Sequence, residues 1–361
     1  MGSLEQAVRR SLTAAAQHVP AYPPDPAAVA IRRGRRAGRV SGSGRALAVM
    51  LATVLAASGA IVGYAYRPGQ GAALPVDVVV GQLLLSRTGS RVELDAAGTP
   101  SAVYATAYGW LVVGEGGVWS TDRSGELVPV LGEPADAVVV EPGGHRVAWR
   151  TGTQLSTATI TDGRAGEPVR TQIPPGVQPV GFAGDAVRLA DATGGQGVWG
   201  TDAPTPTWAG DVLGVYGSLP DGELVGQVRV ASRTGERCLA RIRAADLVVT
   251  ASVCGLDLAA GAAGWVSPNG RWLVAAVGSR GALVDLSTVF DGDPRTVDVG
   301  AAPVGAAAWE GRDTLVRVAS GRLERLRLDQ LWTGRSGGRE RIDVAGVGAD
   351  THLLVVASGQ P

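Results

Sequence analysis

The chain has 361 residues, and Gly (53) and Pro (21) together make up about a fifth of it, a density of turn-forming residues that favours many short strands over long helices. The formal net charge is zero, but residues 1–45 hold eight Arg against two acids, a charge of +6, and the remainder carries −6. An acidic body of this kind argues against nucleic acid as its partner.

The first 45 residues form a basic arm. A capping-box pattern at Ser3 and Gln6, followed by apolar residues at helical spacing, predicts a short amphipathic helix over residues 4–18. Such a helix would dock onto a cytoplasmic partner. The alternative is an arm that is mostly disordered.

Residues 46–66 contain no charged side chain and would span about 31 Å as a helix, close to one hydrocarbon core. Six arginines precede this stretch closely, whereas only Arg67 follows it before Arg87. The positive-inside rule therefore places the N-terminus in the cytoplasm and everything after residue 66 outside. We expect a single-pass transmembrane helix at 46–66, a linker at 67–75 and an extracytoplasmic body at 76–361. A cleaved signal peptide is the alternative, and it also exports the body.

Two glycines inside the apolar stretch, Gly59 and Gly63, have the spacing that lets two membrane helices approach closely. They indicate a weak dimer through the membrane. Spans rich in Ala and Gly also show this spacing by chance.

A repeat is the strongest signal in the body. The hexapeptide at 117–122 (GVWSTD) returns at 197–202 (GVWGTD). A family of turns, each followed by an apolar strand, recurs at Gly109, Gly144, Gly184, Gly222, Gly270, Gly311 and Asp350. The period of about 40 residues, with roughly four short strands in each period, is typical of β-propeller blades. The two hexapeptides should then lie two blades apart.

The two ends of the body complete each other. The last turn has no hairpin after it, whereas residues 81–87 and 91–96 form a hairpin with no turn of this family before it. We therefore expect one blade built from residues 345–358 and about 81–97. A closed ring leaves no sheet edge free to pair with other chains. The predicted fold is all-β: a seven-bladed β-propeller preceded by one transmembrane helix and a short cytoplasmic helical arm.

The body resembles the WD-repeat-like and TolB-like β-propellers. The resemblance rests on Ser267-Pro-Asn-Gly-Arg-Trp-Leu273, which is similar to their S-P-D-G-R-x-[IL] turn, and on Leu219-Pro-Asp-Gly222. It covers residues 76–358 and implies architecture rather than activity. The chain contains no Trp-Asp dipeptide, which separates it from true WD repeats. The basic arm, anchor and exported propeller together resemble bitopic membrane proteins of GC-rich Gram-positive bacteria.

Cys238 and Cys254 are the only cysteines, and they lie on two runs that should pair as a hairpin. In an oxidising exterior they are expected to form a disulfide. The alternative is two buried thiols with no role, and two cysteines alone make no zinc site.

Other motifs carry little chemistry. The G-x-G-x-x-G at 195–200 precedes a strand rather than a helix, which indicates a tight turn. Residues 120–125 faintly resemble the Asp-box turn of sialidase propellers, with the spacing wrong by one. His18, His145 and His352 are the only histidines, and most of the nine Trp should pack between blades, although one exposed on a propeller face would be a ligand candidate. We predict no catalytic, cofactor-binding or metal-ligating residues.

The expected function is a membrane-anchored extracytoplasmic binding, scaffold or sensor module without catalysis, whose ligand is a protein, a peptide or a cell-wall component. One alternative is a transmembrane regulator that couples the propeller to a cytoplasmic factor. Another is a surface enzyme acting on glycans or polyphenols, which would need acids or a His clustered at the mouth of the central channel.

Overall fold

A computed structural model describes residues 74–358 apart from positions 116, 123, 231–235, 260, 262, 293, 345–346 and 348–350. Every strand below belongs to the compact unit Gln70–Pro361. The expected helical arm, the apolar span at 46–66 and the pair Gly59 and Gly63 lie outside the described residues and stay predictions. Within the described part, no helix is both long enough and apolar enough to cross a membrane.

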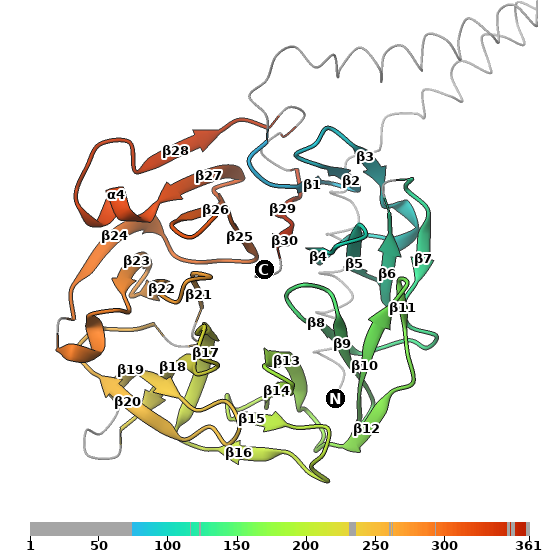
Figure 1. The fold of residues 1–361 in the computed structure, drawn as a ribbon, viewed down its shortest axis with the longest axis horizontal. Helices are drawn as coiled ribbons and strands as arrows, with labels where there is room; N and C mark the ends of the chain where they lie inside the picture. The colour runs from blue at the N-terminus through green and yellow to red at the C-terminus, as the bar shows by residue number, and fades with distance from the viewer. Residues whose placement is uncertain are drawn as a thin grey trace, which may run out of the picture. The chain divides into compact units, whose positions relative to one another are not determined.

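Seven small sheets stand around a common axis, as Figure 1 shows. Each sheet has four main strands ordered from the axis outward, and two sheets carry one additional short strand. The body is therefore the seven-bladed β-propeller that the repeat predicted. The two hexapeptides fall on the third strands of blades 2 and 4, numbered as below, and so lie two blades apart.

The blades are given with their strands from the axis outward. Blade 1 contains β29 (Leu353–Val355), β1 (Val78–Val80), β2 (Leu83–Leu85) and β3 (Arg91–Glu93). Blade 2 contains β30 (Ala357–Ser358), β4 (Ala102–Ala105), β5 (Trp110–Gly114), β6 (Gly117–Thr121) and β7 (Leu127–Pro129). Blade 3 contains β8 (Ala137–Val140), β9 (Arg146–Thr151), β10 (Gln154–Thr161) and β12 (Val169–Gln172), with β11 (Arg164–Ala165) beside β10.

The remaining four blades each have four strands. Blade 4 contains β13 (Gln178–Ala183), β14 (Ala186–Ala190), β15 (Gln196–Trp199) and β16 (Thr207–Ala209). Blade 5 contains β17 (Val212–Ser218), β18 (Leu224–Arg229), β19 (Arg237–Ile242) and β20 (Val249–Val253). Blade 6 contains β21 (Gly264–Val266), β22 (Trp272–Val277), β23 (Arg280–Asp285) and β24 (Thr296–Ala301). Blade 7 contains β25 (Ala307–Trp309), β26 (Thr314–Ala319), β27 (Arg322–Arg327) and β28 (Arg339–Ile342).

Blade 1 joins the two ends of the body, as predicted, but its second strand was assigned wrongly. Both inner strands of this blade were expected within residues 345–358. The second strand is instead β1, which pairs with β29 in the register Val79↔Leu354. The run Val78–Val80 is short and uniformly apolar, so it shows no alternation that would mark it as a strand. The C-terminal strand that remains, β30, pairs in parallel with β4 of blade 2. The ring is thus closed through two sheets.

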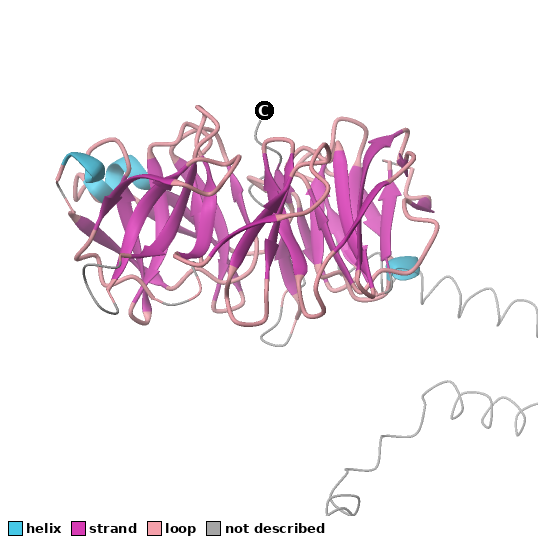
Figure 2. Ribbon diagram, turned by 90° about the horizontal axis from the view of Figure 1, so that it is seen from below, coloured by secondary structure: helices cyan, strands magenta, loops and turns pink. Residues whose placement is uncertain are grey.

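The antiparallel order of the blades defines two faces. We call face A the one that carries the turns from first to second strand and from third to fourth strand, and face B the opposite one. Figure 2 shows the strands running between these two layers of loops. The short helices all lie in connections: α4 (Leu328–Trp332) and η2 (Val289–Asp291) on face A, and η1 (Asp95–Ala97) on face B.

The core lies between neighbouring blades. Many residues of the second strands are buried because both faces of these strands pack against adjacent sheets, and β22 is buried at all positions except its last. Trp272, which is fully buried, belongs to a cluster shared by blades 6 and 7 that also contains Leu315 and Leu326. Inter-blade packing was the predicted role of most Trp side chains. Trp208 is 38% exposed, and it lies on the outer strand β16 rather than on a face.

Candidate functional site

A cleft of about 420 Å³ opens on face A between blades 2 and 3. Four turns form its walls: 106–109 and 143–145 join first strands to second strands, and 122–126 and 161–163 follow third strands. They meet because face A carries both kinds of turn in each blade. The aromatic, acidic and imidazole side chains at the rim are Tyr108, Asp122, Glu126, His145 and Asp162.

The turn at 106–109 places Tyr108 in solvent. The Oγ1 atom of Thr106 accepts hydrogen bonds from the backbone N–H groups of Tyr108 (3.2 Å) and Gly109 (3.1 Å). Gly109 has no room for a side chain, because a Cβ there would lie 2.1 Å from the carbonyl oxygen of Thr121. The ring of Tyr108 is 83% exposed, which is unusual for an aromatic side chain without a partner.

Two close contacts fix the floor of the cleft and join the blades. Ser120 of blade 2 donates a hydrogen bond to the carbonyl oxygen of Gly163 of blade 3 at 2.9 Å. A Cβ on Gly163 would come within 2.5 Å of that Ser120 hydroxyl. A Cβ on Gly144 would similarly meet the methyl group of Thr106 at 2.4 Å. The cleft is therefore a preformed feature rather than a gap between mobile loops.

The described residues that line the cleft carry a negative charge. Asp122, Glu126 and Asp162 contribute carboxylates, and no Arg is among these described residues. Hydrogen bonds from the Ser124 hydroxyl and backbone N–H to Asp122 lower the pKa of this carboxyl group. Asp122 therefore stays ionised to a lower pH than an ordinary aspartate does. The cleft can attract cations and repels anions.

Three other acids on face A are engaged with arginines. The ion pairs are Glu141–Arg146 (2.7 Å), Glu223–Arg241 (2.6 Å) and Glu310–Arg325 (2.8 Å). The strands nearest the axis in Figure 1, β4, β8, β13, β17, β21, β25, β29 and β30, contain no Asp, Glu, His or Arg. The enzyme alternative requires a group of acids or histidines at the mouth of the central channel. These described strands bring no such group together at the axis.

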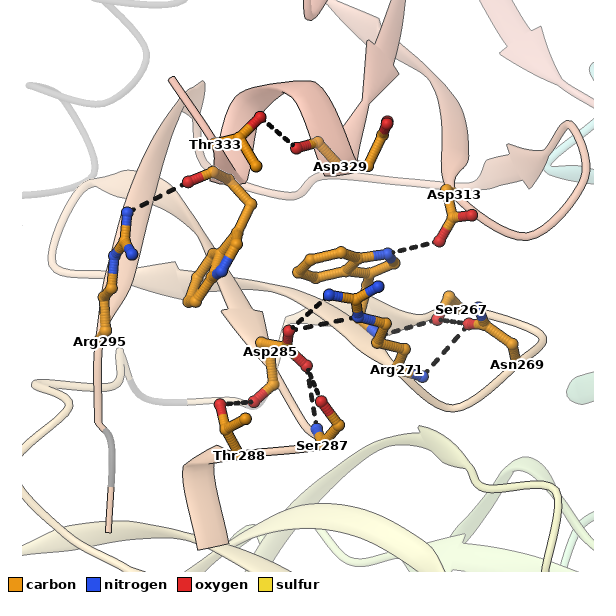
Figure 3. Close-up of polar contacts among 12 residues, drawn as sticks. Ser267, Asn269, Arg271, Asp285, Ser287, Thr288, Arg295, Asp313, Asp329 and Thr333 are labelled. Carbon is orange, nitrogen blue, oxygen red and sulfur yellow. Dashed lines mark hydrogen bonds and ion pairs between the residues drawn. The ribbon is translucent and has the colours of Figure 1, made fainter. Parts of the chain in front are cut away.

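The turn that carries the family resemblance is a structural clasp between blades 6 and 7, drawn in Figure 3. Ser267 accepts a hydrogen bond from the backbone N–H of Trp272 (2.8 Å) and donates to Asn269 (2.6 Å). The side chain of Arg271 binds Asp285 at 3.1 Å and lies 4.3 Å from the centre of the Trp272 ring.

The same tryptophan reaches the next blade. Its Nε1–H group donates to Asp313 of blade 7 at 2.7 Å. The side chains of this turn are therefore satisfied internally and hold two blades together, which leaves them a stabilising role rather than a ligand-binding one.

The predicted disulfide between Cys238 and Cys254 is confirmed. It connects β19 to the residue that follows β20, on the outer part of blade 5. Glu236 lies within reach of both sulfur atoms. Because the sulfurs are bonded to each other, they offer no thiolate to a metal ion.

The two remaining motifs differ from each other. Residues 196–199 of the G-x-G-x-x-G motif form strand β15 itself, so the prediction that this motif is a tight turn is wrong; the turn comes just before it, where the N–H of Gly194 donates to the carbonyl oxygen of Asp191. The segment 120–125 is a hairpin turn and also supplies Asp122 and Ser124 to the cleft. The turns at Gly109, Ser120 and Gly144 each have a recognisable sequence pattern, but nothing in the sequence indicates that they form one cleft. Only the packing of blade 2 against blade 3 does so.

No protein-family model matches the chain, and no curated protein matches it. A functionally unknown protein from Desulfotomaculum acetoxidans DSM 771 has a similar structure, with a TM-score of 0.50 and 11% identity over 78% of this chain and 99% of that one. Hydrazine synthase from Kuenenia stuttgartiensis has a TM-score of 0.48 and 13% identity, over 72% of this chain and 87% of that one. BamB from Moraxella catarrhalis has a TM-score of 0.44 and 13% identity, over 66% of this chain and 74% of that one. The first of these likenesses supports the fold alone.

Proposed function

We propose that the propeller is a non-catalytic binding module whose face A cleft takes a positively charged segment of a protein or peptide partner. The proposal is supported by three carboxylates and an exposed tyrosine in one preformed cleft whose described lining residues include no Arg. An ammonium or guanidinium group in the cleft would be attracted by Asp122, Glu126 and Asp162. It could also lie over the ring of Tyr108, an interaction that contributes about 0.5–1 kcal/mol at exposed sites.

The geometry gives less support to glycan hydrolysis. That reaction needs a carboxylic acid whose pKa is raised so that it can protonate the leaving group. The hydrogen bonds from Ser124 shift the pKa of Asp122 in the opposite direction. The cleft also disfavours anionic wall polymers, because its own charge is negative.

We further propose that residues 46–66 anchor the chain in a membrane, with the propeller on the extracytoplasmic side. The uncharged length of this segment and the arginines before it support the anchor. The Cys238–Cys254 disulfide supports an extracytoplasmic location of the propeller, because disulfides persist in oxidising compartments. A role for the basic arm in signalling to a cytoplasmic factor remains an open alternative.

Calorimetric titration of the full-length chain with an eight-residue lysine–glycine peptide tests the binding proposal. The triple variant Asp122→Asn, Glu126→Gln and Asp162→Asn should bind at least roughly tenfold more weakly, since each exposed pair contributes about 0.5 kcal/mol. Added salt should weaken the wild type more than the variant.

The matched control removes three exposed acids from face B: Glu93→Gln, Asp95→Asn and Glu115→Gln. It changes the net charge equally and should bind as the wild type does. Equal affinities of the two triple variants would contradict a specific site in the cleft.

A further inference from the structure

We propose a second site, on face B beside blade 7, that binds an amphiphilic phosphate ester: the phosphate against a group of arginines and the apolar part in an adjoining hollow. The first half is a pocket of about 390 Å³ at the junction of blades 6 and 7. Its lining residues with charged or hydroxyl side chains are Ser320, Arg322, Glu324, Arg339 and Arg341.

Strand register explains why these charges gather. Arg317 on β26 lies opposite Glu324 on β27, and Glu324 lies opposite Arg341 on β28. Cross-strand partners share one face of a sheet, so the three side chains form a row across blade 7. This face is turned toward blade 6, because Arg317 donates hydrogen bonds to the carbonyl oxygens of Val299 (2.6 Å) and Ala301 (2.8 Å).

The acid in the row is already neutralised. The guanidinium of Arg317, which is 1% exposed, binds Glu324 at 2.7 Å. The other carboxylate oxygen of Glu324 forms an ion pair with Arg339 at 3.3 Å. Arg322 and Arg341 have no ion pair or hydrogen-bond partner among the described residues. Four arginines therefore face one glutamate, which leaves an excess of three positive charges at the pocket.

The position of Arg339 is constrained by the neighbouring blade. A Cβ on Gly300 would lie 3.1 Å from a guanidinium nitrogen of Arg339, so this side chain packs directly on the backbone of β24. Planar guanidinium groups bind phosphate oxygens through paired hydrogen bonds. Several such groups around one pocket, with the Ser320 hydroxyl at its rim, suit a tetrahedral phosphate better than a planar carboxylate, which a single guanidinium can satisfy.

The second half of the site is apolar and continuous with the first. A hollow of about 400 Å³ shares Ala301, Ala319 and Ser320 with the arginine pocket. Its other lining residues include Val304, which is 75% exposed, and Leu354. An exposed valine beside the two unpaired arginines, Arg322 and Arg341, fits a ligand with a charged head and an apolar tail.

Titration of the full-length chain with dihexanoyl phosphatidic acid and, separately, with inorganic phosphate tests this proposal. We expect the short-chain lipid to bind at least tenfold more tightly than inorganic phosphate. Arg322→Gln with Arg341→Gln should weaken both ligands at least tenfold, whereas the uncharged change Val304→Ser should weaken only the lipid. The control Arg312→Gln with Arg335→Gln removes two exposed charges from face A of the same blade and should change neither affinity.

Absence of binding, or binding that survives Arg322→Gln with Arg341→Gln, would overturn the proposal. Equal affinity for lipid and inorganic phosphate would also overturn it, because the apolar hollow would then have no part. Thermal unfolding of each variant separates a lost site from a lost fold.

Discussion

Arg317 and Glu324 form a charged pair inside the protein. Arg317 is 1% exposed and makes four hydrogen bonds, two to Glu324 and two to the carbonyl oxygens of blade 6. Such a pair is costly to desolvate, but breaking it leaves an uncompensated charge. Its energetic role therefore depends on whether one or both partners are removed.

We predict that Arg317→Met alone lowers the free energy of unfolding by about 3–5 kcal/mol, because the buried Glu324 would lose its closest partner and keep only Arg339 at 3.3 Å. Arg317→Met combined with Glu324→Leu should cost clearly less than Arg317→Met alone. Urea denaturation of the two variants and the wild type gives both values. If the double variant were the less stable of the two, the pair would be stabilising in itself.

Tyr216, on the inner strand β17, is buried with no hydrogen-bond partner for its hydroxyl among the described residues. Burial raises the pKa of this hydroxyl. An unfolded tyrosine ionises near pH 10, whereas the folded one stays protonated, so ionisation favours the unfolded state and stability falls as the pH rises above about 10.

We predict that Tyr216→Phe stabilises the protein by about 1 kcal/mol at neutral pH, because it removes a buried polar group that lacks a partner. The loss of stability above pH 10 should also be shallower in the variant. Denaturant titrations at pH 8 and pH 10.5 measure both effects. A destabilised variant would show that the hydroxyl has a partner, such as a buried water.

At the scale of single elements, blade 5 is the one with a covalent link. Cys238 and Cys254 close a segment of about 15 residues, for which the loop-entropy model gives about 3 kcal/mol. We predict that Cys238→Ala with Cys254→Ala lowers the free energy of unfolding by about this amount. Reducing agent should destabilise the wild type equally and leave the variant unaffected. Identical urea midpoints for reduced and oxidised wild type would contradict this.

The sequence predicted the elements well where they repeat. Turns at Gly144 or Gly270 adopt positive φ and precede an apolar strand, so they mark each second strand. It failed for β1, where three valines carry no alternation and no marking turn. The cleft could not be predicted either, because its carboxylates come from turns about 40 residues apart and meet only through the packing of Gly163 on Ser120.

At the scale of the whole molecule, the ring depends on its C-terminal strands. β29 completes blade 1 and β30 joins blade 2, while Leu353, Val355 and Val356 are all buried. Without them, β1 and β4 would present open edges. That the two ends of the body share a blade was predictable from sequence. The last turn has no hairpin after it, and residues 81–87 and 91–96 supply the missing pair of strands.

We predict that deletion of residues 351–361 lowers Tm by roughly 10 °C or more, since three buried aliphatic side chains contribute about 1.5 kcal/mol or more each. The truncated chain should also aggregate through its open edges. Deletion of residues 1–11, which is equally long, serves as the control and should leave Tm unchanged. A truncated chain as stable as the wild type would show that the ring does not depend on this closure.

The binding role of face A can be located directly by hydrogen–deuterium exchange of the full-length chain with and without the lysine–glycine peptide. We predict slower exchange at the four turns that form the cleft, residues 106–109, 122–126, 143–145 and 161–163. Residues on face B should exchange at an unchanged rate. Protection confined to other blades, or no protection at a peptide concentration that saturates binding, would contradict the cleft as the binding site.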